Sequence, residues 1–307
     1  MRGIAYDRFG GVDVLQLRDD LPDPPVGPDT VLVRTRAAGV NPVDIGIREG
    51  ALAGFFPHHF PIVPGWDLAG VVEAVGPAVV DFAPGDEVFG YLRRDDVQWG
   101  TAAELVPAPQ RCVAHKPGSL SFAEAGAVPL AGLTAYQALT EALAVGEGDR
   151  VLVHRAAGGV GFFAVQIAVA LGAQVIGTAS PRNHGFLTDA GCAEVLDYNA
   201  GPISGQLSEK VDAVLDLNGG NSLADAPAQV RDVSRIASVV DPSVNGMGGR
   251  YVFVRPERHD LEELARMADA GQLRVAIAKA FPLAQTAQAH ELVAGGHVRG
   301  KVVVTVP

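Results

Sequence analysis

A glycine-rich turn is the first segment whose residue types and spacing point to chemistry. The run His154-Arg155-Ala156-Ala157-Gly158-Gly159-Val160-Gly161 follows a short apolar stretch and opens a longer one, which is the strand–turn–helix context of a dinucleotide-binding loop. Aligned on G-x-G-x-x-G, the second glycine would let the backbone approach a pyrophosphate, and the third would let helix and strand pack closely. A turn that binds nothing is the alternative, which this context disfavours. We expect phosphates to contact the turn and the helix N-terminus at Ala157, Gly158, Gly159, Val160 and Gly161.

The residues after the next strand bear on which nicotinamide cofactor fits. An NAD site usually ends this strand with Asp or Glu, which holds the ribose 2′-OH. Here the chain runs Gly177-Thr178-Ala179-Ser180-Pro181-Arg182-Asn183, without a carboxylate. Ser180 can donate a hydrogen bond and Arg182 can pair with a 2′-phosphate, although a solvated loop charge is the alternative for Arg182. Ser180, Arg182 and Asn183 therefore favour NADP(H) over NAD.

Composition excludes several classes of protein. The chain has 307 residues, of which 48% are hydrophobic, so it is long enough for two domains with large cores. Its net charge of −11 and its lack of basic runs argue against a nucleic-acid binder. No run approaches the ~18 apolar residues of a membrane span, and no signal-like segment opens the chain, so a cytoplasmic protein is expected. Cys112 and Cys192 are the two cysteines, too few for a disulfide framework or a cysteine-rich zinc site.

Residues 1–119 read as mostly β, because short apolar runs near 31–33, 70–72 and 87–89 are broken by Gly and Pro. Residues 121–144 predict two helices, since Ser121 and Glu124 match a capping box and Pro129 and Gly132 interrupt the pattern. From residue 150 strands and helices alternate, which predicts a parallel, doubly wound sheet over 120–255. The expected strands are 151–153, 175–177, 194–196, 213–217, 236–240 and 251–254, with helices at 161–171 and 186–190. The tail, with helices at 261–270 and 286–293 and a strand at 301–306, is expected to return and complete the first domain over 256–307.

With these residues in place, the chain resembles the medium-chain dehydrogenase/reductase superfamily, and within it the zinc-independent quinone oxidoreductase branch. The resemblance covers nearly the whole length, and the joint order of its motifs is specific. It rests on residues 38–44 with Arg48 and Gly50, then 65–76, 84–88, 131–136, 158–161 and 300–303. It implies an α/β protein with a GroES-like, mostly-β catalytic domain and a doubly wound Rossmann domain. It also implies a cofactor in the cleft between them, a small-molecule substrate and a homodimer.

The resemblance also indicates that zinc is absent. Zinc alcohol dehydrogenases of this superfamily carry a ligand Cys where this chain has Asn41, and Gly-His-Glu where it has Gly65-Trp66-Asp67. Asn and Trp do not supply the thiolate and imidazole that zinc requires, and the four-cysteine structural zinc lobe is missing. The adjacent His58-His59 pair reads better as loop histidines than as ligands. We expect no metal site.

The resemblance assigns roles to further residues. Asn41 is expected beside the nicotinamide, with capping of the turn before Pro42 as its alternative. Thr134 resembles a threonine near the nicotinamide carboxamide, with helix capping or back-bonding as its alternative. These two are the catalytic candidates. Tyr198, Asn218, Phe253, Val254 and Lys301 complete the cofactor candidates, although Phe253 and Val254 also read as plain core and Lys301 as a strand-edge lysine.

The expected absence of zinc limits which reaction the protein can catalyse. Without zinc, alcohol oxidation loses its Lewis acid, whereas reduction of an enone or quinone needs a hydride and donors for the charge that develops on oxygen. We therefore expect NADPH-dependent reduction of a small quinone or α,β-unsaturated carbonyl compound. Ile45 and Ile47 stand where many relatives carry Tyr or Lys, which leaves the proton donor open; Tyr91 and Trp99 are candidates for shaping the substrate pocket. An enoyl-thioester reductase and a cofactor-binding, non-catalytic relative are the alternatives.

Overall fold

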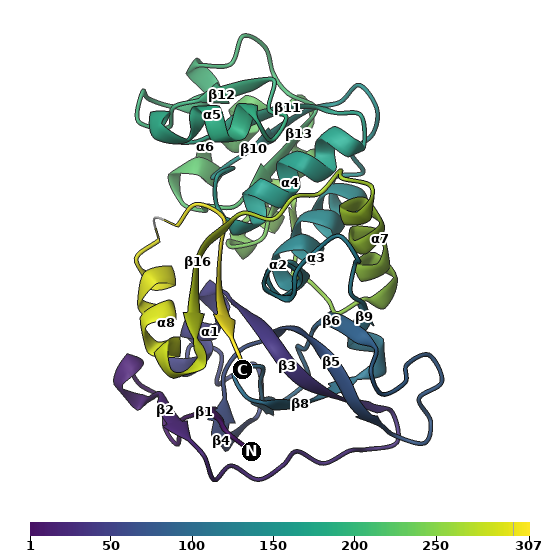
Figure 1. The fold of residues 1–307 in the computed structure, drawn as a ribbon. Helices are drawn as coiled ribbons and strands as arrows, with labels where there is room; N and C mark the ends of the chain where they lie inside the picture. Colours follow the sequence, from purple (N-terminus) through teal and green to yellow (C-terminus); the bar gives the residue numbers. More distant parts are fainter. Residues whose placement is uncertain (297) are drawn as a thin grey trace. The chain divides into compact units, whose positions relative to one another are not determined.

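The computed structural model describes residues 1–296 and 298–307. The chain forms two compact units (Figure 1). Unit 1 comprises Met1–Leu130, Pro256–Asp269 and Val275–Pro307, and unit 2 comprises Ala131–Arg255 and Ala270–Arg274. Within the described ranges, no helix is long and apolar enough to cross a membrane.

Unit 1 is built on a seven-stranded sheet. Its order is β16-β17-β3-β5-β6-β9, and β8 also pairs with β3. The long strand β3 (Thr30–Val40) pairs antiparallel with both β5 and β17, which brings the end of β3 next to residues near the C-terminus. The remaining bounds are β5 (Asp67–Val75), β6 (Glu87–Tyr91), β8 (Leu105–Pro109), β9 (Val113–His115), β16 (Ile277–Pro282) and β17 (Lys301–Thr305). Two small sheets pair β1 (Gly3–Ala5) with β2 (Gln16–Arg18) and β4 (His58–Val63) with β7 (Val97–Trp99).

In the described ranges, four α-helices lie wholly within unit 1. They are α1 (Pro42–Arg48), α2 (Phe122–Ala127), α7 (Arg258–Asp269) and α8 (Thr286–Ala294). Helix α1 starts directly after β3 with Pro42 at its first position, where the missing N–H of proline is harmless. Helix α2 starts at the predicted capping box, in which the Ser121 and Glu124 side chains each bond the other residue's backbone N–H. Because α1 follows β3 without a loop, the direction of β3 fixes where the residues at the start of α1 lie.

Unit 2 is a six-stranded parallel sheet in the order β12-β11-β10-β13-β14-β15. The strands are β10 (Arg150–Val153), β11 (Gln174–Thr178), β12 (Glu194–Leu196), β13 (Ala213–Asp216), β14 (Ile236–Ser238) and β15 (Arg250–Tyr251). Its helices are α3 (Pro129–Gln137), most of which lies in unit 2, α4 (Gly159–Ala170), α5 (His184–Thr188) and α6 (Asn221–Gln229). The order reverses at β10, so the carboxyl ends of β10 and β13 flank the switch point at which ligands bind in such sheets. The predicted strand–helix alternation is confirmed.

Several predicted elements differ from the structure. The strand expected at 251–254 ends at Tyr251, and beyond it the backbone N–H and C=O of Arg255 bond the Gln137 side chain instead of a neighbouring strand. Gly132 does not interrupt α3; the break falls before Pro129. The helix expected at 186–190 runs instead over α5, two residues earlier. Helix α1 and strand β16 were not predicted.

Candidate functional site

The dinucleotide turn of unit 2 joins β10 to α4 as predicted. Gly158 is the N-cap of α4 and offers no side-chain acceptor, so the first amides of the helix remain for a ligand. A Cβ on Gly161 would lie 2.5 Å from the Arg155 carbonyl oxygen and 2.6 Å from the Ala156 Cα. Only glycine therefore permits this approach of helix and turn. The residues fit the phosphates of a nicotinamide dinucleotide.

The residues predicted to favour NADP(H) over NAD follow the end of β11. Ser180 is half-buried and precedes a 3-10 turn, Pro181–Asn183, in which Arg182 is exposed. Asn183 Nδ2 lies 3.4 Å from Ser180 Oγ. Because β10 and β11 are parallel neighbours, this segment and the glycine turn lie at the same edge of the sheet.

The other unit 2 candidates are spread over several strand ends. Tyr198 follows β12 and is 54% exposed. Asn218 follows β13, is exposed and donates to Ser222. Phe253 and Val254 follow β15, with Phe253 exposed and Val254 half-buried, which argues against the alternative of plain core. Thr134 is buried inside α3. Their contacts with a cofactor stay predictions.

Four buried residues of unit 1 form what we call the lysine cluster: Asn41, Asp44, Asp67 and Lys301. Neighbouring strands assemble it, since Asn41 follows β3, Asp67 begins β5 and Lys301 begins β17. The Lys301 ammonium donates to Asn41 Oδ1 and lies 3.4 Å from Asp67 Oδ2. Asn41 Nδ2 donates to Asp67 Oδ2 at 2.8 Å, and the Leu130 backbone N–H donates to Asp67 Oδ1 at 2.6 Å. Asn41 and Lys301 are thus two predicted residues, far apart in the sequence, that the structure brings together.

Lys301 departs from both of its sequence interpretations. It is 4% exposed, and β17 pairs with β16 on one side and β3 on the other, so it is not a strand-edge lysine. Its ammonium is engaged by Asn41 and Asp67, which disfavours the predicted contact with a cofactor phosphate. Lys301 instead fixes the orientation of the Asn41 amide.

Asp44 is the least satisfied member of the lysine cluster. Its Oδ2 accepts the Asn41 backbone N–H at 2.8 Å, while its Oδ1 has no hydrogen-bond partner in the described part of the chain. Burial raises the pKa of Asp44 to about 7; the Asn41 hydrogen bond and Lys301 oppose the shift and the negative charge of Asp67 adds to it. Burial also raises the pKa of Asp67, against the effects of Lys301, Asn41 and Leu130. With two carboxyls and one ammonium, the cluster is neutral when Asp44 holds a proton.

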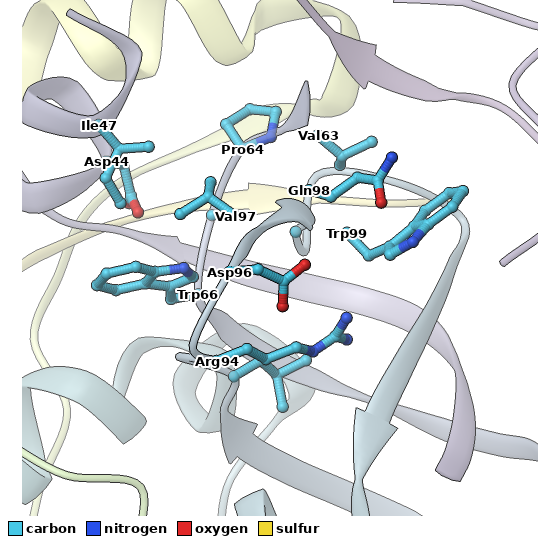
Figure 2. A pocket seen from close by; sticks show the side chains of 13 residues that line it. Asp44, Ile47, Val63, Pro64, Trp66, Arg94, Asp96, Val97, Gln98 and Trp99 are labelled. Carbon is cyan, nitrogen blue, oxygen red and sulfur yellow. The ribbon is translucent and has the colours of Figure 1, made fainter. Parts of the chain in front are cut away.

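Asp44 borders two cavities, each of about 10 Å³ and therefore large enough for roughly one water molecule. The first is lined by residues of α1, of the segment 63–66 and of the loop 92–100 (Figure 2). The predicted Trp99 lines it together with Trp66. The predicted Tyr91 is 1% exposed and packs edge-on against Trp66, with ring centroids 6.0 Å apart. Tyr91 thus supports the cavity wall through Trp66.

A second buried polar group, which we call the histidine cluster, lies at the carboxyl edge of the unit 2 sheet. It comprises His154, Asp216, Gln229 and Ser238. His154 Nδ1 lies 3.2 Å from Asp216 Oδ1, and His154 Nε2 lies 3.0 Å from Gln229 Oε1. Ser238 Oγ donates to Asp216 Oδ2 at 2.8 Å, and the Gly219 N–H donates to the same carboxylate at 3.1 Å. The cluster thus ties together the loops that follow β10, β13 and β14.

Hydrogen bonding dominates the electrostatics of the histidine cluster. Burial acts to raise the pKa of Asp216, but the hydrogen bonds from His154 and Ser238 outweigh it and hold the pKa below its usual value. These four residues were not predicted as a site. The available signal was polar residues directly after or at the end of apolar strand runs, at His154, Asp216 and Ser238.

The donor set of unit 1 does not fit the zinc ion of the alcohol dehydrogenases that the chain resembles. Trp66 offers no lone pair, and the Asn41 oxygen faces an ammonium group. Asp67 is committed to Asn41, Leu130 and Lys301. In the described ranges, no three His, Cys, Asp or Glu residues gather in a metal-binding arrangement.

Two family models match the chain. Residues 27–118 match the model described as an alcohol dehydrogenase GroES-like domain, and residues 190–304 match one described as a zinc-binding dehydrogenase. The first match covers most of the β-rich part of unit 1, and the second spans the later Rossmann strands and the returning tail. The predicted fold class, a GroES-like domain with a Rossmann domain, is confirmed.

Individual relatives match over nearly the whole chain. The mitochondrial NAD(P)H oxidoreductase RTN4IP1 of Danio rerio is 31% identical over 98% of this chain and 90% of its own. The chloroplastic NADPH-dependent alkenal/one oxidoreductase of Arabidopsis thaliana is 32% identical over 99% of this chain and 79% of its own. The solved quinone oxidoreductase from Coxiella burnetii is 34% identical, with a TM-score of 0.92, over 100% of this chain and 99% of its own. The chain belongs to the medium-chain dehydrogenase/reductase superfamily, in its quinone oxidoreductase-like branch, and is an oxidoreductase of a family that uses nicotinamide cofactors.

Proposed function

We propose that the protein reduces a small quinone or α,β-unsaturated carbonyl compound with NADPH, by hydride transfer and without zinc. The observation that carries this proposal is the Asn41–Asp67–Lys301 arrangement. The Asn41 amide stands where the zinc alcohol dehydrogenases have a ligand cysteine, and its two ends are bonded to the Lys301 ammonium and to Asp67. Such a group can stabilise negative charge on an oxygen but offers no Lewis acid for alcohol oxidation.

The cofactor preference rests on the segment after β11. It has no carboxylate to receive a ribose 2′-OH, and it places the exposed Arg182 two residues after Ser180. A guanidinium pairs with a 2′-phosphate through two parallel hydrogen bonds. The alkenal/one relative is named as NADPH-dependent, which supports the same choice here.

We assign Asn41 the role of hydrogen-bond donor to the reacting groups. A bound nicotinamide supplies the hydride. The Asn41 amide is held at both ends, because Lys301 donates to its oxygen and its nitrogen donates to Asp67. Its nitrogen carries a second N–H, which can be offered to the cofactor carboxamide or to the oxygen on which charge develops. A donor fixed before the reaction loses no energy to reorientation as that charge appears.

A substrate panel tests the proposed reaction. The purified full chain is mixed with NADPH and 1,4-benzoquinone, a simple enone or crotonyl-CoA, and the absorbance of the reduced cofactor is followed. Turnover of the quinone or the enone is expected. Turnover of the CoA thioester alone would replace the proposal with an enoyl-thioester reductase, and NADPH binding without turnover would favour a non-catalytic relative.

Cofactor choice is tested separately by binding. Arg182→Ala should weaken the binding of NADPH by about tenfold or more, because a charge-assisted contact with the 2′-phosphate is lost. NADH binding serves as the internal control and should be unchanged. A wild-type protein that binds NADH more tightly than NADPH contradicts the assignment of Ser180 and Arg182.

A further inference from the structure

Arg155, in the dinucleotide turn, has a backbone conformation that is unusual for its residue type. Its φ of +50° lies in the left-handed region, and Ala144 is the other non-glycine residue with positive φ in the described ranges. A side chain at such a position costs roughly 1–2 kcal/mol relative to the right-handed conformation, whereas glycine adopts it freely. The conformation is held from both sides, because the Arg155 N–H donates to Thr178 Oγ1 and the Arg155 C=O accepts from the Gly158 N–H, each at 3.0 Å. These two contacts use the backbone alone, so a residue of another type at this position could make them as well.

The Arg155 side chain is exposed and runs over Gly158. The position that a Cβ on Gly158 would take lies 3.7 Å from Arg155 Cγ and 3.9 Å from Arg155 Nε. Gly158 is the N-cap of α4. The guanidinium is thus carried to the end of the helix that presents backbone N–H groups and the positive end of the helix dipole.

We propose that Arg155 is an affinity-determining residue that binds the pyrophosphate of the nicotinamide dinucleotide, in addition to the backbone amides of the glycine turn. Guanidinium pairs with phosphate oxygens through charge-assisted, often bidentate hydrogen bonds. The cation also offsets the negative field of a chain with a net charge of −11, which otherwise repels an anionic cofactor. The inference requires a dinucleotide cofactor, but neither the NADPH preference nor the substrate proposed above.

The strained conformation gives the proposal a test with two opposed readouts. Arg155→Gly removes both the strain and the charge. The melting temperature of the protein without cofactor should rise, because glycine is relaxed at this φ. The affinities for NADPH and NADH, measured by calorimetric titration at fixed salt, should both fall by about tenfold, the effect of losing a hydrogen bond to a charged group.

Matched variants separate strain from charge. Ala144→Gly relaxes the other positive-φ residue, which is also exposed, and should raise the melting temperature without changing either affinity. Arg155→Asn keeps a residue that tolerates the left-handed region but removes the charge, so it should lose affinity as Arg155→Gly does. It also keeps the test usable if Arg155→Gly fails to fold.

Each outcome decides the assignment. Equal weakening of both cofactors supports a pyrophosphate contact. If Arg155→Gly and Arg155→Asn bind both cofactors as tightly as the wild type, the assignment is overturned. It is also overturned if only the affinity for NADPH falls, since the guanidinium would then contact the 2′-phosphate. A wild-type preference for NADH, with both affinities still weakened in the variants, would overturn the proposed cofactor choice and leave the Arg155 assignment standing.

Discussion

The lysine cluster of unit 1 and the histidine cluster of unit 2 contain similar groups, but they differ in the hydrogen bonding of their carboxyl oxygens. Each surrounds a fully buried carboxylate, Asp67 or Asp216, with a nitrogen base and an amide side chain. In the histidine cluster both oxygens of Asp216 accept hydrogen bonds. In the lysine cluster a second carboxyl, Asp44, adds an oxygen with no partner in the described ranges. The difference lies in how completely the acceptors are paired.

The pKa shifts also differ between the two clusters. The pKa of Asp216 is lowered although it is buried, whereas burial raises those of Asp44 and Asp67 despite a nearby ammonium. The donors to Asp67, one of them charged, do not offset its burial, whereas the donors to Asp216 do. At Asp44 the negative charge of Asp67 adds to the effect of burial. We infer that the histidine cluster is a structural tie between loops, and that the lysine cluster is an electrostatically unsatisfied site beside Asn41.

Removing the lysine should have the largest effect on either cluster. Lys301→Met leaves two buried carboxyls without their cation, and we expect a loss of about 3 to 5 kcal/mol in the free energy of unfolding at pH 8. The loss should be smaller at pH 5, because Asp44, whose pKa is raised to about 7, then holds a proton and one carboxylate fewer is left without its cation. Denaturant unfolding at the two pH values measures both effects.

Lys279→Met is the matched control for that substitution. Lys279 lies on the neighbouring strand β16, is exposed and sits over the Phe281 ring, so its loss should cost less than about 1 kcal/mol. If Lys301→Met is as mild as the control, the ammonium does not hold the cluster together, and the contrast between the two clusters disappears.

Asp216→Asn should have the next largest effect. An amide cannot accept hydrogen bonds on both of its terminal atoms, so at least one of the donors from His154, Ser238 and Gly219 is left unpaired. We expect a loss of about 2 to 3 kcal/mol at pH 7, measured by denaturant unfolding. Because the pKa of Asp216 is lowered by folding, this stabilisation is present near neutral pH and is lost as the pH falls through the folded-state pKa.

Asp225, in helix α6 of the same unit, provides the comparison. Its pKa is also lowered, with hydrogen bonds from Ser204 and Gln229 opposing burial, but it is more accessible to solvent. Asp225→Asn should therefore cost less than Asp216→Asn. Equal losses would show that burial adds nothing to the role of Asp216.

The sequence predicted the elements whose patterns are local. The glycine turn and the strand–helix alternation of unit 2 follow from apolar runs of fixed length closed by glycine. Strand β16 was not predicted because four of its six residues are exposed and it therefore shows no buried run; in the described part of the chain it pairs with β17 alone. Helix α1 is short and contains Gly46, although Pro42 at its first position was a visible start signal.

The two clusters could not be predicted in the same way. Asp67 and Lys301 are 234 residues apart, and Asp216 and His154 are 62 apart. Sheet pairing brings each pair together, and pairing of distant strands leaves no local pattern in the sequence. Arg155 was visible in the turn, but its left-handed φ was not.

The smallest effect we predict is a change in the pH dependence of stability at Asp44. Folding raises its pKa from 3.8 to about 7, so the folded state binds more protons than the unfolded state between these values. The contribution of Asp44 to stability is therefore greatest at low pH and is lost as the pH rises through about 7. By linkage, the free energy of unfolding of the wild type minus that of Asp44→Asn should decrease by about 1 to 2 kcal/mol between about pH 5.5 and 7.5.

The free energy of unfolding of the wild type alone is not sufficient, because the contribution of His290 changes with pH in the direction opposite to that of Asp44. His290 lines one of the cavities beside Asp44, and burial, with the positive charge of Arg48, lowers its pKa from 6.5 to about 4. Its contribution is present above pH 6.5 and falls as the pH drops, so the two residues partly cancel in wild-type stability alone. In a His290→Gln background the decrease attributed to Asp44 should persist unchanged. A flat difference in both backgrounds would mean that Asp44 is ionised near pH 6, and the lysine cluster would then carry a net negative charge beside Asn41.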